Sequence, residues 1–153
     1  ATAPLIEKMH PFGMIWGARF ISPSGIFSGA NPTNYNNAGV DRYIVFMTDG
    51  ALNTDPNNYG LYGVEYLDKR VTGGYTSDTD QDSRHNRRFL IACTETKARG
   101  NALWVIGFAQ ALTTELTACA SSADKASTSA DSAALIAKFQ EIGKQIGALR
   151  LTK

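Results

Sequence analysis

The sequence lacks the features that mark several common classes of protein. Its 15 lysines and arginines nearly balance its 14 aspartates and glutamates, so the formal net charge is +1, and the basic residues form no dense cluster. Nucleic acids and anionic membrane surfaces are therefore not expected as partners, because concentrated positive charge recognises both. The longest apolar runs are about five or six residues, far short of the ~20 that cross a bilayer, so we expect no membrane span in this chain.

Cysteine and histidine are also scarce, with two of each. Cys93 and Cys119 have no zinc-like spacing and no histidine near them in the sequence. They fit two buried free thiols as well as a disulfide, which would close a loop of about 26 residues and contribute roughly 3 kcal/mol in the chain-entropy model. His10 and His85 lie far apart in the sequence, and we interpret both as surface or helix-capping residues.

Short catalytic and nucleotide-binding motifs are absent from the sequence. There is no Gly-x-Ser-x-Gly elbow, phosphate-binding loop or dinucleotide fingerprint. Asp78, Asp80 and Asp82 alternate as at the start of a calcium loop, but Ser83 and Phe89 stand where that loop needs glycine and glutamate. We interpret these aspartates as an acidic lead into a helix, and we expect that the protein is not an enzyme.

The most informative stretch is the apolar run 43–47, which is followed by Thr48, Asp49 and Gly50. Such a continuous run predicts a strand that is buried on both faces, as in a parallel sheet covered by helices. Ligands of these sheets bind beyond the carboxyl ends of the strands, where Asp49 would stand. Asp49 is therefore the main candidate for a cation ligand. The alternative role of Asp49 is that of a turn aspartate that accepts a backbone hydrogen bond.

The rest of the sequence predicts further helices, one more strand and polar loops. Turn-rich composition predicts loops over 29–39, 50–82 and 118–130. Apolar periodicity and capping residues predict a helix over 11–20, a helix from Asp82 or Ser83 to Arg99, a buried strand over 103–108, a short helix over 111–116, and a last helix capped by Asp131. This order predicts an α/β fold, and because two strands make no stable parallel sheet, we expect further strands on the N-terminal side.

Several of these segments resemble, in order, the C-terminal part of TadG-like proteins, a von Willebrand factor A group from the tight-adherence (Flp) pilus machinery of bacteria. The resemblance covers nearly the whole chain and implies a doubly wound, mostly parallel α/β sheet of the Rossmann-like type. Residues 1–153 would then be a single domain, the C-terminal half of a von Willebrand factor A domain that lacks its N-terminal strands. The segments that carry the resemblance are Gly13–Arg19, Ser22–Pro23, Val45–Gly50, Cys93 with Lys97, Trp104–Phe108, Cys119–Ser121 and Leu149–Leu151.

The resemblance also implies a metal-ion-dependent adhesion site that holds magnesium. In the family this site combines an Asp-x-Ser-x-Ser motif of the first strand, a threonine of a later loop, and an aspartate that follows a strand in a Thr-Asp-Gly-like motif. Only the last of these carries over to this chain, as Asp49. The first motif is absent, and Lys8, Met9 and His10 stand where the threonine is expected, so we expect an incomplete site.

The function that the resemblance implies is that of a non-enzymatic protein of the bacterial cell envelope, periplasmic or extracellular. It would act in pilus assembly or adhesion by presenting the strand-end crevice and the 50–82 loop to partner proteins. Export favours a Cys93–Cys119 disulfide. The 43–48 strand would lack its central neighbour, so we expect another segment or chain to cover its edge. The alternatives are a free-standing secreted binding module and a cation-dependent α/β enzyme that uses Asp49.

Overall fold

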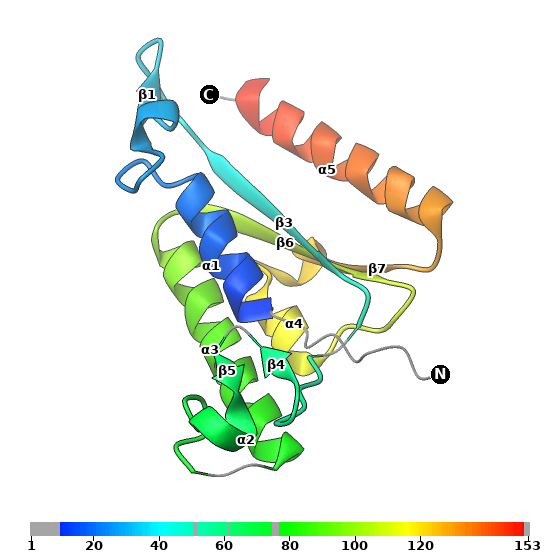
Figure 1. Cartoon of the computed structure of the whole chain (residues 1–153). Helices are drawn as coiled ribbons and strands as arrows, with labels where there is room; N and C mark the ends of the chain where they lie inside the picture. Colours follow the sequence, from blue (N-terminus) through cyan, green and yellow to red (C-terminus); the bar gives the residue numbers. More distant parts are fainter. Residues whose placement is uncertain (1–9, 51, 61, 75–76, 152–153) are drawn as a thin grey trace.

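A parallel three-stranded sheet with helices on both faces organises the protein (Figure 1). The structure, a computed structural model, describes residues 10–50, 52–60, 62–74 and 77–151, with side chains as far as residue 147. The strands lie in the order β3 (Arg42–Thr48), β6 (Asn101–Phe108) and β7 (Ala126–Ser129). Helices α1 (His10–Phe20), α3 (Asp78–Ala98) and α4 (Thr114–Cys119) cover one face, and α5 (Ser132–Leu151) lies on the other. The α/β class predicted from the sequence is confirmed at this level.

Short elements occupy the three segments that the sequence predicts as loops, 29–39, 50–82 and 118–130. Within 29–39, Asn36 and Asn37 both adopt positive φ (50° and 64°), as the two central residues of a type I′ hairpin turn do. The 50–82 segment contains a second small hairpin and one helical turn. These short elements are η1 (Ser28–Ala30), β1 (Asn34–Tyr35), β2 (Ala38–Gly39), β4 (Tyr59–Gly60), β5 (Gly63–Val64), α2 (Glu65–Asp68) and, before β7, η2 (Ala123–Lys125).

The central strand β6 is the most deeply buried element of the sheet. Its residues 103–107 are all buried, because β6 has a strand on each side and helices on both faces. Leu103 and Val105 face the cluster formed with α1, α3 and α4, whereas Trp104 and Ile106 face Ile142 of α5. Alternate residues of one apolar run therefore belong to two separate cores.

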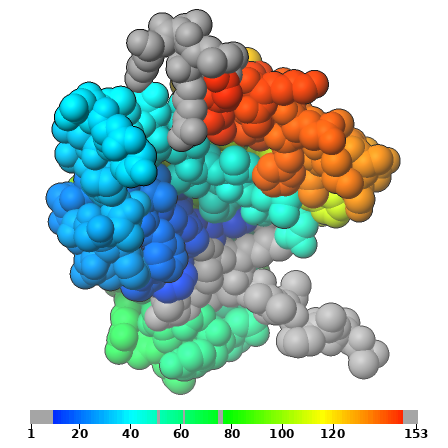
Figure 2. Space-filling model, turned by 90° about the horizontal axis from the view of Figure 1, so that it is seen from above, coloured from blue at the N-terminus to red at the C-terminus, as the bar shows by residue number. Residues whose placement is uncertain are grey.

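The 43–48 strand forms as predicted, but the prediction that it is buried on both faces was wrong. Among the described strands, β3 pairs only with β6, from Arg42 with Asn101 to Thr48 with Gly107. Residues 42–46 are half-buried and Met47 is 50% exposed. Figure 2 shows atoms of this stretch at the surface between those of α1 and α5. An apolar run of this kind does not tell a central strand from an edge strand.

The sequence interpretation missed the third strand of the sheet. β7 lies inside the 118–130 segment that we predict as a loop, and it pairs in parallel with β6 from Val105 with Ala126 to Phe108 with Ser129. Its four residues are alanine, serine and threonine, so the segment has no apolar run to mark a strand. The sheet therefore has three strands among the described residues, rather than the two expected.

Two predicted helix boundaries were also wrong. α3 begins at Asp78, four residues before Asp82, because the Ser77 hydroxyl accepts a hydrogen bond from the Asp80 amide (3.2 Å) and caps the helix. α4 begins at Thr114 after the capping residue Thr113, rather than at 111. The start of α5 agrees with the prediction, since the Asp131 carboxylate accepts a hydrogen bond from the Ala134 amide (2.8 Å).

The last helix packs on the sheet through only part of its apolar set. Leu135, Ile142 and Ile146 contact the Trp104–Ile106 side of the sheet. Ile136 and Phe139 are 59% and 44% exposed, so they face away from the sheet. None of the described helices is both long and apolar enough to cross a bilayer.

Candidate functional site

The carboxyl ends of the three parallel strands meet at one edge of the sheet, where the sequence places the candidate crevice. Asp49 follows β3 at this edge and is exposed, whereas Thr48 and Gly50 on either side of it are buried. The amide of Ala109, which follows β6, donates a hydrogen bond to the carbonyl of Ser129 at the end of β7 (2.8 Å). The structure thus confirms the position of Asp49 at a strand end.

Thr48 and His10 form a buried hydrogen bond beside Asp49. The Thr48 hydroxyl lies 2.9 Å from the Gly50 carbonyl and 2.9 Å from His10 Nε2. Which group donates in the His10–Thr48 bond depends on the tautomer of the imidazole. The pair holds the start of α1 against the end of β3.

Both histidines are buried, so their assignment to the surface was wrong. His10 is 7% exposed, and its ring lies 5.6 Å from the rings of both Phe46 and Phe89. His85 is 1% exposed, and its ring lies 5.8 Å from the Tyr62 ring. Burial and the nearby Arg88 guanidinium lower the pKa of His85 below its ordinary value, despite the carboxylates of Glu65 and Asp82. Two histidines isolated in a sequence give no periodic signal of such burial.

The residues around Asp49 do not fit the magnesium site that the resemblance implies. His10 is one of the three positions where the family threonine is expected, and its Nε2 is engaged with Thr48. Lys8 and Met9, the other two positions, lie outside the described residues. Within the described part of the chain, no three histidine, cysteine, aspartate or glutamate side chains gather as metal ligands would. Asp49 alone does not supply the several oxygens that a hard cation requires.

The alternating aspartates at the start of α3 join this helix to the loop before it. The Asp82 carboxylate accepts hydrogen bonds from the Thr54 amide (2.8 Å) and hydroxyl (2.7 Å). Asp80 accepts a bond from the Ser77 hydroxyl (3.0 Å) next to the cap of the helix. The three aspartates therefore lie within the first turns of α3, rather than in a loop that leads into the helix.

A buried carboxylate holds the 65–72 segment together. Glu65 is 2% exposed and accepts hydrogen bonds from the Val71 amide (2.9 Å) and from the Thr72 amide (2.7 Å) and hydroxyl (2.6 Å). Burial by itself raises the pKa of Glu65, but the hydrogen bonds from Thr72 and Val71 outweigh it, and the pKa lies below its ordinary value of 4.5. The ionised form of Glu65 therefore stabilises this fold of the loop.

We expect the 65–72 segment to open in acid. Because the folded-state pKa of Glu65 is lowered, its stabilisation is fully present above the ordinary value of 4.5 and is lost as the pH falls through the folded value. Protection factors of the Val71 and Thr72 amides, measured by hydrogen exchange, should fall in acid for the wild type. Glu65→Gln should lower them at neutral pH and remove their dependence on pH. An acid dependence that survives in Glu65→Gln would contradict this role.

The two cysteines join α3 to α4. The Cα atoms of Cys93 and Cys119 lie 5.3 Å apart in a disulfide, and both side chains are buried in the larger core. Lys97, one turn after Cys93, donates hydrogen bonds to the carbonyls of Ala118 (2.9 Å) and Ala120 (3.2 Å). Of the two states that the sequence leaves open, the structure therefore contains the disulfide.

Comparison of the chain with protein-family models, with curated proteins and with solved structures finds no match. The link to the von Willebrand factor A group therefore rests on the sequence resemblance alone.

Proposed function

We propose that this chain is a non-enzymatic, exported binding domain of the TadG-like kind, which acts in pilus assembly or adhesion by binding proteins. The observation that carries the proposal is the β3 edge, meaning the side of strand Arg42–Thr48 that does not pair with β6. An uncovered strand edge presents a row of backbone donors and acceptors to which another strand can add. In the doubly wound von Willebrand factor A architecture a further strand would lie beside β3, which would account for such an edge among the described strands.

The side chains of β3 suit a strand that is covered in the working assembly. Ile44 and Phe46 pack against the core under α1 and α3, and Val45 packs toward α5. The strand is therefore anchored on both faces while Met47 remains 50% exposed at its end. Arg42 at the start of β3 is its only charged residue, and neither charged residues nor prolines, which commonly protect the edges of sheets, occur over 43–48. The lack of such protection supports pairing with a partner.

The Cys93–Cys119 disulfide supports a periplasmic or extracellular location. Disulfides form and persist in oxidising compartments and are rare in the cytosol. The proposal assigns no role to magnesium, since the described residues near Asp49 do not supply a ligand set.

The proposal can be tested with Met47→Lys, because a lysine on an edge strand disfavours the addition of another strand. We expect the purified wild-type chain to associate with increasing concentration and the amides of 43–48 to be protected from hydrogen exchange in the associated form. Met47→Lys should remain monomeric. Ile136→Lys is the matched control, because Ile136 is similarly exposed but lies on α5, away from the β3 edge. Sedimentation velocity and hydrogen exchange measure the two properties.

A monodisperse wild-type monomer whose outward β3 amides exchange freely would overturn the role of the edge. The pilus assignment has its own test in the bacterium that encodes the chain. There, Met47→Lys should reduce surface pili and Ile136→Lys should not, as counted by electron microscopy.

A further inference from the structure

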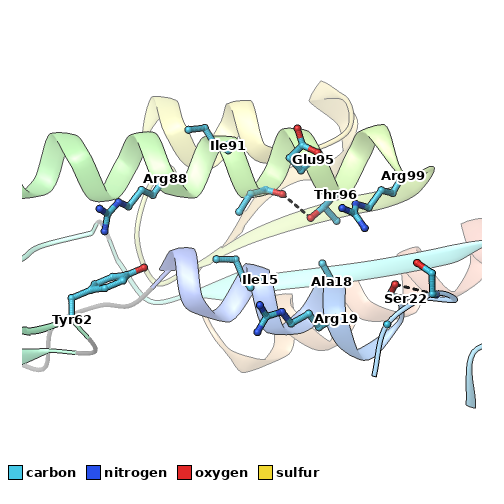
Figure 3. Close-up of a pocket in the computed structure, with 13 residues that line it drawn as sticks. Ile15, Ala18, Arg19, Ser22, Tyr62, Arg88, Ile91, Glu95, Thr96 and Arg99 are labelled. Carbon is cyan, nitrogen blue, oxygen red and sulfur yellow. Dashed lines mark hydrogen bonds between the residues drawn. The ribbon is translucent and has the colours of Figure 1, made fainter. Parts of the chain in front are cut away.

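A groove of about 530 Å³ lies between α1 and α3, on the face of the sheet opposite α5 (Figure 3). The two helices run side by side, and the loop after α1 and Tyr62 complete the groove at its ends. Its volume is within the range of sites that bind small ligands. No described residue at Asp49 or along the β3 edge lines it, so the groove is a separate surface.

The floor of the groove is apolar and open to solvent. Ile15 and Ala18 of α1 and Ile91 and Ala92 of α3 line it. Ile91 is 55% exposed, although it stands on a helix whose opposite side carries the buried Phe89 and Cys93. The Thr96 hydroxyl donates to the Ala92 carbonyl (2.6 Å), so its proton is satisfied within α3. The floor therefore offers apolar area rather than free hydrogen-bonding groups.

The rim of the groove is positively charged. Arg19, Arg88 and Arg99 line it together with a single carboxylate, that of Glu95. In the part of the chain that the structure describes, none of the three guanidinium groups forms an ion pair. This excess of positive charge stands out in a chain whose formal net charge is only +1. An occupant that complements the groove carries negative charge at its ends.

The position of Arg88, unlike those of the other two arginines, is not favoured by the helix dipole. Arg19 stands in the last turn of α1 and Arg99 caps the end of α3, positions where a cation is favoured by the helix dipole. Arg88 lies in the middle of α3, and its guanidinium stacks over the Tyr62 ring at 4.9 Å. Figure 3 shows Arg88 and Tyr62 at one end of the groove and Arg19 and Arg99 toward the other. The stacking therefore holds the Arg88 guanidinium beside Tyr62 at this end of the groove.

The distance between the arginines at the two ends of the groove fits an extended ligand. Arg88 and Arg99 are eleven residues apart along α3, which corresponds to about 16 Å at 1.5 Å per residue. About five residues of extended peptide span the same distance. We propose that the groove binds an extended peptide segment of a partner protein, with apolar side chains on Ile15, Ala18 and Ile91 and an acidic residue at each end. This inference rests on the proposed role in protein binding but uses a surface distinct from the β3 edge.

The test is an amide NMR titration of the full chain with the capped hexapeptide acetyl-Asp-Leu-Ala-Leu-Ala-Asp-amide. We expect saturable shifts at Ile15, Ala18, Ile91 and Ala92, and weaker binding as salt is added. The same hexapeptide with asparagine at both ends should bind at least fivefold more weakly. Arg88→Gln should weaken binding of the acidic peptide by a similar factor, and Arg88→Lys should retain part of it.

Two further variants separate the groove from other surfaces. Ile91→Glu places a carboxylate on the floor and should abolish binding, whereas Ile136→Glu on α5 should leave it unchanged; both positions are exposed, so both variants should fold. Met47→Lys should bind the hexapeptide as the wild type does. A failure of the β3-edge proposal can therefore be distinguished from a failure of the groove proposal.

Three outcomes would overturn the proposal. They are equal affinity for the acidic and the asparagine-ended peptide, shifts that saturate outside the groove, and Arg88-dependent binding of dodecanoate without binding of the peptide. The last result would assign the groove to a small anionic amphiphile instead.

Discussion

Replacing Cys93 and Cys119 together by alanine should lower the free energy of unfolding by about 3–4 kcal/mol. The disulfide links residues 26 positions apart, and in the chain-entropy model a loop of this length restricts the unfolded chain by that amount. Both side chains are buried in the core with Leu103 and Leu116, so the variant also loses packing there. Urea denaturation of the oxidised proteins, followed by circular dichroism, measures the difference.

A reducing agent provides the matched control for this experiment. It should destabilise the wild type toward the level of the variant and should leave the double-alanine protein unchanged. Equal unfolding midpoints for the oxidised wild type and the variant would contradict a structural role of the disulfide. The result also bears on location, because a domain that depends on this bond for stability is suited to an oxidising compartment.

Phe89→Ala should destabilise the protein by about 3–5 kcal/mol, the range for removing a fully buried phenylalanine. Phe89 is 1% exposed, and its ring lies 5.2 Å from that of Phe46 and 5.6 Å from that of His10. It therefore joins α3 to β3 and to the start of α1. The cavity left by alanine should also loosen the contact between His10 and Thr48, which the chemical shifts of the His10 ring report.

Phe139→Ala is the control, because it removes a side chain of the same size from an exposed position. Phe139 is 44% exposed on α5, so its removal should cost less than about 1 kcal/mol. Urea denaturation compares the two variants under the same conditions. A similar loss of stability in both variants would contradict the role of the cluster around Phe89 in packing α1 and α3 on the sheet.

The elements that the sequence predicted well carry strong local signals. The apolar run 103–108 and the Asp131 cap of the last helix are both in place in the structure. β7 was missed because its burial comes from its position beside β6, and nothing in Ala126–Ser129 marks it. The α/β class was therefore predictable, whereas the number of strands and the edge position of β3 depend on tertiary contacts.

The candidate site was predictable in its position but not in its chemistry. The motif at 48–50 correctly placed Asp49 at a strand end. The partner of Thr48 was not predictable, because His10 lies 38 positions away and reaches it only when α1 packs on the sheet. The groove between α1 and α3 was missed for the same reason, since Arg19 and Arg88 belong to separate helices and become neighbours only after folding.

The topology of the sheet also predicts the order in which its strands pair during folding and separate during unfolding. β6 and β7 pair between Val105 and Ala126, whereas β3 and β6 pair between Arg42 and Asn101, so the second pairing closes a much longer loop. Longer loops cost more entropy to close, and non-local pairing slows folding. β3 should therefore dock last during folding and detach first in local unfolding. A partner strand on the β3 edge would therefore slow the detachment of β3, which is the first step in the opening of the sheet.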